Sequence, residues 1–192
     1  MAQLLAWRYT LSTVFFVALG AVLLGTSIPT AAWGNLLPFF EWLETTPFGL
    51  IGKTWGASFA LVEAVHLLGL ALLGGALIVG DGRLAGFWLT SVEGHLVQAN
   101  VQRLVTVAVT TLILTGVFMV CSVAVKVYYL EVFWYKMLCL LAGCLFFYGI
   151  RTPWVQRSME VEAPWTSRAV AASNFLIWGS VGATGRWIGF SG

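Results

Sequence analysis

Charge is what this sequence has least of. Lys, Arg, Asp and Glu make up 9% of its 192 residues, against roughly a quarter in an ordinary soluble domain. Because 59% of the residues are hydrophobic, water cannot be the main solvent of the folded chain. The few basic residues are scattered and the formal net charge is only +2, which excludes the basic face that a nucleic-acid partner would need.

Cysteine and catalytic motifs are scarce as well. The three cysteines, Cys121, Cys139 and Cys144, all lie in apolar stretches, where we expect small buried hydrophobes rather than a disulfide framework. The chain lacks a nucleophile beside a base, a phosphate-cradling glycine loop and a His-Glu-x-x-His zinc motif. We therefore expect no catalytic activity from the chain on its own.

What the sequence does contain is long apolar runs. Five of them are nearly free of charge and long enough for a helix to cross a hydrocarbon core about 30 Å thick. The runs predict an all-α, integral membrane bundle of about five transmembrane helices, forming a single domain over residues 1–192. Arg8, the apolar run after it and the small residues Thr30-Ala31-Ala32 also fit a secretory signal with a cleavage site, but we expect this segment to be retained as a helix. The predicted spans are residues 9–28, 54–79, 101–125, 134–150 and 169–187.

The connections between the spans carry their own patterns. Aromatic and aliphatic side chains mingle with two glutamates over residues 36–51, which predicts a short interfacial helix between the first and second spans. Gly80-Asp81-Gly82-Arg83 predicts a turn that ends the second span, with Asp81 and Arg83 paired. Thr90 and Glu93 have the spacing of a capping box, so the next helix is predicted to begin near Ser91.

An odd number of spans places the two termini on opposite faces of the membrane. Basic residues are more numerous on the face of the N-terminus, which favours a cytoplasmic N-terminus by the positive-inside rule. The comparison is six against four: Arg8, Arg83, Arg103, Arg151, Arg157 and Arg168 against Lys53, Lys126, Lys136 and Arg186.

Glu63 and His66 are the only pair of ionisable residues near the middle of a predicted span. They are three positions apart on one helix, so we expect them on one face. Burying an ionisable group at this depth costs on the order of 3 kcal/mol, so both are expected to face the bundle interior. The pair could act as an interhelical polar clamp, or it could serve a function.

A cofactor beside His66 is one such function. Haem b or copper could bind there, with Cys144 as a second metal ligand and Glu63 nearby. A haem between His66 and His95 is disfavoured, because the two residues differ in depth by roughly 20 Å if their helices stand upright.

Several sequence pieces resemble one family. They are Glu63-x-x-His66-Leu-Leu-Gly-Leu-Ala-Leu-Leu-Gly, Asp81-Gly-Arg83-Leu-Ala-Gly86, Thr115-Gly116, Phe133-x-x-Lys136 and Gly185-Arg186-Trp187. They resemble an uncharacterised family of small bacterial multi-pass membrane proteins, itself distantly similar to copper resistance D-like membrane proteins. The resemblance implies the bacterial inner (cytoplasmic) membrane.

Three functions stay open on the sequence. The first is a membrane subunit or accessory protein of a larger complex that supports electron transfer or metal handling around Glu63 and His66. The second is a cofactor-free subunit that anchors a membrane enzyme through its aromatic faces. The third is passage of an ion or small solute past Glu63. In each case the expected partners are the lipid bilayer and either another protein or further copies of the chain.

Overall fold

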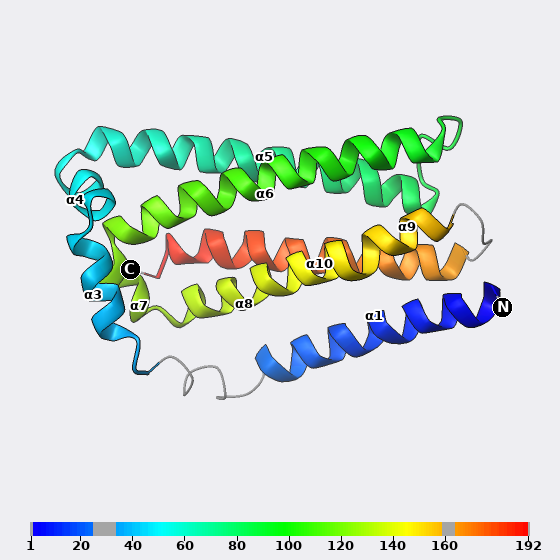
Figure 1. The fold of residues 1–192 in the computed structure, drawn as a ribbon, viewed down its shortest axis with the longest axis horizontal. Coiled ribbons are helices and arrows are strands. Elements are labelled where there is room, and N and C mark those ends of the chain that lie inside the picture. The colour runs from blue at the N-terminus through cyan, green and yellow to red at the C-terminus, as the bar shows by residue number, and fades with distance from the viewer. Residues whose placement is uncertain (1, 25–33, 159–163, 192) are drawn as a thin grey trace.

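Five long helical rods lie roughly alongside one another in the computed structural model (Figure 1). The structure describes residues 2–24, 34–158 and 164–191. No strand occurs in this part of the chain, so the all-α prediction is confirmed. The rods are α1 (Ala2–Leu24), α5 (Gly56–Ala85), α6 (Gly94–Ser122), α10 (Pro164–Ile188) and a composite rod in which α8 (Glu131–Phe146) continues through the π-helical turn η1 (Phe147–Arg151) into α9 (Thr152–Ser158).

Three of these rods are long and apolar enough to cross a membrane: Gly56–Ala85, Gly94–Ser122 and Glu131–Arg157. The sequence predicted five, so the count is confirmed only in part within the described residues. The last four positions of the predicted first span, and Thr30 to Ala32 of the alternative signal, lie outside those residues.

Short helices form the connections at one end of the bundle. α3 (Leu37–Thr45) and α4 (Pro47–Thr54) occupy the region predicted as one interfacial helix, and α7 (Ala124–Tyr128) packs against α3. Thr46 separates α3 from α4, and its hydroxyl accepts a hydrogen bond from the Gly49 amide, which caps the start of α4.

Glu44 ties α3 to the start of α7. Its Oε1 atom accepts a hydrogen bond of 2.8 Å from the Val125 amide, and its Oε2 atom pairs with Lys53. Burial by itself raises the pKa of Glu44, but the hydrogen bonds from Lys53 and Val125 outweigh burial and hold this pKa below its ordinary value. Glu44 therefore stays charged as a structural link at this end.

The predicted turn at residues 80–83 is wrong, because α5 continues through it to Ala85. The two glycines allow close packing rather than a turn: a Cβ on Gly80 would lie 2.6 Å from Val101 Cγ1, and one on Gly82 would lie 2.1 Å from the Trp88 indole. The helix ends instead at Gly86, whose φ of +83° is in the left-handed region that favours glycine at a helix C-terminus.

The predicted capping box is also wrong. α6 begins at Gly94, and Glu93 precedes it without a side-chain capping bond. The Glu93 carboxylate instead lies 3.2 Å from Nδ1 of His95. Glu93 thus contacts the second residue of α6, in place of the reciprocal bonds that the spacing of Thr90 and Glu93 suggested.

An apolar core fills the middle of the bundle. It is built from one stripe of α5, one stripe of α6, and side chains of the α8 rod and of α10. Its members include Leu73, Leu77, Val105, Ala108, Leu112, Phe147 and Trp178, all 8% exposed or less. α10 packs between α5 and the α8 rod, whereas α1 packs on the outside of α10 and α8. This core separates the polar groups at the two ends of α5.

Candidate functional site

The structure separates the two residues of the predicted pair. His66 is half-buried, and its Nδ1 atom lies 2.8 Å from the hydroxyl of Thr115 on α6. Glu63 is exposed on the outside of α5, so the prediction that it faces the interior is wrong. Successive residues of a helix are rotated by about 100°, so side chains three positions apart lie about 60° apart around the axis. This angle is enough to place His66 at the contact between α5 and α6 while Glu63 lies outside that contact.

The possible metal or haem ligands Glu63, His66 and Cys144 differ in their surroundings. Nδ1 of His66 is engaged by Thr115, and Glu63 points away from the bundle. Cys144 packs against the apolar core. Within the described ranges no group of three or more His, Cys, Asp or Glu side chains could hold a metal ion. The described residues therefore hold no cluster of three ligands for a copper ion at His66, and a haem b site there stays a prediction.

A different set of polar residues forms a buried network near the other end of α5. Arg151 and Asp81 are joined by a salt bridge of 2.6 Å between Nε and Oδ1, and both are at most 4% exposed. Nη2 of Arg151 donates to Oε1 of Gln98 at 3.0 Å, and Nδ2 of Asn174 donates to Oδ2 of Asp81 at 2.7 Å. Asp81, Gln98, Arg151 and Asn174 are named here the charged network, which links α5, α6, η1 and α10.

Local sequence features make room for this network. Arg151 is the last residue of the π-helical turn η1, and its guanidinium lies 4.9 Å from the centre of the Phe147 ring. Single π-turns inside α-helices are frequent at functional sites. On the facing helix a Cβ at Gly80 would lie 2.7 Å from Nη2 of Arg151, and the Gly80 carbonyl accepts a bond from Gln98. Gly80 thus lets the guanidinium reach the backbone of α5.

The charged network retains unused hydrogen-bonding capacity. A guanidinium carries five N–H donors, and the contacts described for Arg151 use two of them. Oδ1 of Asn174 is buried and has no partner among the described residues. Since buried polar groups are normally paired, these groups mark the network as a candidate binding region.

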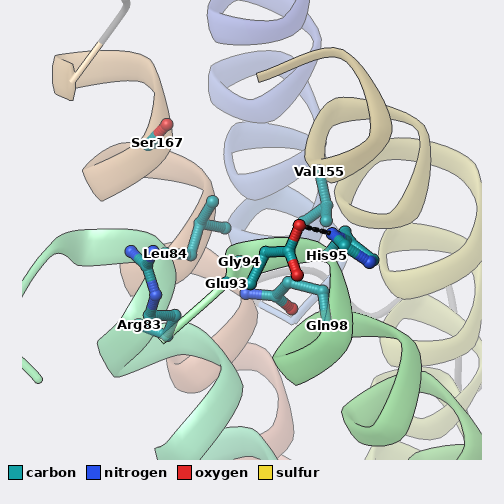
Figure 2. A pocket seen from close by; sticks show the side chains of 8 residues that line it. All are labelled: Arg83, Leu84, Glu93, Gly94, His95, Gln98, Val155 and Ser167. Carbon is teal, nitrogen blue, oxygen red and sulfur yellow. Dashed lines mark ion pairs between the residues drawn. The ribbon is translucent and has the colours of Figure 1, made fainter. Parts of the chain in front are cut away.

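An open cleft of about 460 Å³ lies at the same end of the bundle. Figure 2 shows the side chains that line it, which come from the end of α5, the start of α6, α9 and the start of α10: Arg83, Leu84, Glu93, Gly94, His95, Gln98, Val155 and Ser167. Gln98 belongs to both the cleft and the charged network, so it connects the opening to the buried ion pair.

Sequence reasoning missed this site. Asp81 was assigned to a turn with Arg83, and Arg151 was counted among the basic residues of a solvated end; the structure pairs Asp81 with Arg151 instead. The available signal was that Asp81, Gln98, Arg151 and Asn174 all lie within about two or three turns of one end of apolar helices. Polar residues in such positions on several helices favour a shared contact.

Comparison with known proteins identifies a family but no characterised relative. No curated protein and no solved structure matches the chain. A protein-family model described as a family of unknown function, DUF6644, matches residues 39–191, so α1 lies outside the matched region. That match covers well over half of the chain, and the protein therefore belongs to the family of unknown function DUF6644.

Proposed function

We propose that this protein is a membrane-embedded subunit of a larger assembly, joined to a partner through the outer face of α5. The observation that supports the proposal is the exposure of Glu63 about two turns inside the apolar helix α5. A carboxyl group that faces lipid within a membrane span is unfavourable, by on the order of 3 kcal/mol at the centre of the span. A partner that covers Glu63 and donates hydrogen bonds to it removes much of that penalty.

The surroundings of Glu63 favour a transmembrane helix as the partner. Ala60 and Ala64 are both exposed and stand one turn apart beside Glu63, and small residues at this spacing let two helices approach closely in a membrane. Charge complementarity requires a basic or hydrogen-bond-donating side chain on the partner helix at the depth of Glu63.

The buried interior supports this function better than passage of an ion or solute, and better than an electron-transfer or metal centre. A polar path across the membrane would have to pass the apolar core between His66 and the charged network, where Val105 and Ala108 are fully buried. An electron-transfer or metal centre at His66 would need further ligands, and the described ranges hold no group of three His, Cys, Asp or Glu side chains that could bind a metal ion.

We further propose that all five rods cross the membrane. α10 is 25 residues long and packs between α5 and α8, so it shares their surroundings. Its low hydropathy reflects polar side chains such as Asn174 that are buried within the protein. With five crossings, the resemblance to bacterial membrane proteins and the excess of basic residues support the bacterial inner membrane and a cytoplasmic N-terminus.

Site-specific photo-crosslinking in native membranes tests the partner. A photoreactive residue at position 64 is compared with one at Leu114, which is 68% exposed on α6. We expect position 64 to give an adduct whose partner peptide is a transmembrane segment with a basic or donor residue. Glu63→Gln should lower the yield about fivefold, equivalent to about 1 kcal/mol, the size of a hydrogen bond between membrane helices.

Two outcomes would overturn this function. One is an adduct between two copies of the chain, which would make the face a homodimer interface. The other is equal crosslinking from positions 64 and 114 that is indifferent to Glu63→Gln, since contact with random neighbours would then explain both.

A further inference from the structure

We infer that the cleft above the charged network binds a small oxyanion, the carboxylate or phosphate group of a solute or a lipid headgroup. The cleft is open at one end of the bundle and closed below by Gln98, which is only 7% exposed and bonded on both sides, to the Gly80 carbonyl and to Arg151. It is therefore a site entered from one face, and its volume of about 460 Å³ is within the range of small-molecule pockets.

The charges around the cleft determine the class of ligand. The Asp81 carboxylate is compensated by Arg151, and Glu93 is in contact with His95. Arg83 has no carboxylate partner in the part of the chain that the structure describes, and its Nε atom is buried without a hydrogen bond there. Arg83 is thus the cation of the cleft that forms no ion pair among the described residues, and oxyanions are the ligands that a guanidinium binds best.

Further donors lie in the same cleft. Nη2 of Arg83 is held by the Val92 carbonyl at 3.1 Å, which fixes the guanidinium over the connection between α5 and α6. The Ser167 hydroxyl accepts a bond of 3.2 Å from the Trp154 indole, so its own proton is free to be donated. In Figure 2, Arg83 and Ser167 flank one side of the opening, and Glu93 with His95 lies on the other.

The charged network supports this site from below. Arg151 has N–H donors beyond the two that Asp81 and Gln98 engage. A shift of the Gln98 side chain would open the guanidinium to the cleft, so Arg151 is assigned as a positioning residue that holds Gln98. Glu93 is a negatively charged residue in the same cleft as Arg83. Removing the Glu93 charge should strengthen oxyanion binding, whereas removing the Arg83 charge should weaken it.

Binding is measured by calorimetry and by the shift in unfolding temperature, using the full chain in phosphatidylcholine nanodiscs. Inorganic phosphate and succinate are the soluble probes, and nanodiscs that contain phosphatidylglycerol test the headgroup source. The control is Arg103→Gln, since Arg103 is exposed at the same end but does not line the cleft. Arg83→Lys tests whether charge without the guanidinium fork suffices.

We expect Arg83→Gln to raise the dissociation constant about tenfold or more, Arg83→Lys to give an intermediate value, and Glu93→Gln to lower the constant by about threefold. Arg103→Gln should leave the constant within about twofold, because an exposed charge outside the site is screened by salt. A response to phosphatidylglycerol alone assigns the oxyanion to a lipid, and a response to phosphate or succinate assigns it to a solute.

The inference fails if none of the three probes gives saturable binding. It also fails if Arg83→Gln and Arg103→Gln weaken binding equally, because a general field at this end of the bundle would then account for the effect. Neither result bears on the partner of Glu63, since the cleft and Glu63 lie at different ends of α5.

Discussion

Glu63 and Asp81 are two acidic residues on the same helix with opposite surroundings. They are eighteen positions apart (81 − 63), about five full turns at 3.6 residues per turn, so an ideal helix would present both on one side. Yet Glu63 is exposed and Asp81 is 4% exposed beneath Arg151 and Asn174. Burial of this side of α5 is decided by the helices that cover it at one end and leave it open at the other.

The two residues also differ in whether their charge has partners within the described part of the chain. Asp81 has a cation and an amide as partners, so its charge strengthens contacts among three helical segments, α5, η1 and α10. Glu63 has no partner in the described part of the chain, so its charge is a liability in lipid unless another helix covers it. The two residues should therefore respond oppositely to neutralisation.

The largest effect is expected from Arg151→Gln. Removing one member of a buried ion pair leaves the other uncompensated and lowers the free energy of unfolding by about 3–5 kcal/mol. Unfolding in mixed micelles with increasing SDS, followed by circular dichroism, measures the change. The double variant Arg151→Met with Asp81→Leu should recover most of the loss, because replacing both charges leaves neither unpaired. A change in stability as small in Arg151→Gln as in Glu63→Gln would remove the distinction between the two acidic residues.

A smaller effect is expected at Gly80. The methyl group of Gly80→Ala would meet Val101 and Arg151 at 2.6–2.7 Å, and such overpacking lowers stability by about 1–3 kcal/mol. Gly74 on the same helix has no neighbour within 4 Å of its added Cβ, so Gly74→Ala should be neutral or stabilise the protein by up to about 1 kcal/mol through helix propensity. Both variants are compared in the same SDS unfolding experiment, and equal stabilities would show that Gly80 does not serve the charged network.

The smallest effect concerns the end of α5 that carries Glu63 and His66. Thr115→Val removes the hydrogen bond to His66 and should lower stability by about 0.6–1.7 kcal/mol, the measured range for polar contacts between membrane helices. Thr111 is the matched control, since its hydroxyl donates only to the Val107 carbonyl of its own helix. Thermal unfolding of both variants gives the comparison, and a loss in Thr111→Val as large as in Thr115→Val would contradict an interhelical role for His66.

Much of the fold followed from hydropathy alone. The predicted spans 54–79, 101–125 and 134–150 each overlap a helix that is long and apolar enough to cross a membrane, because long apolar runs have few other structures available to them. Helix ends were less accurate: glycines that suggested a turn at residues 80–83 serve close packing instead. A glycine signals both uses equally, and only the neighbouring helix distinguishes them.

The candidate site, like the fold, was predicted from the sequence only in part. The sequence by itself determined that this chain is an all-α membrane protein and that each ionisable residue in its spans needs a partner, because lipid solvates neither charge nor free backbone groups. Only the tertiary structure decided which partner each one has. Arg151 is seventy positions from Asp81 (151 − 81), and they meet because η1, α6 and α10 pack around the end of α5, a relation that spacing along one helix cannot encode.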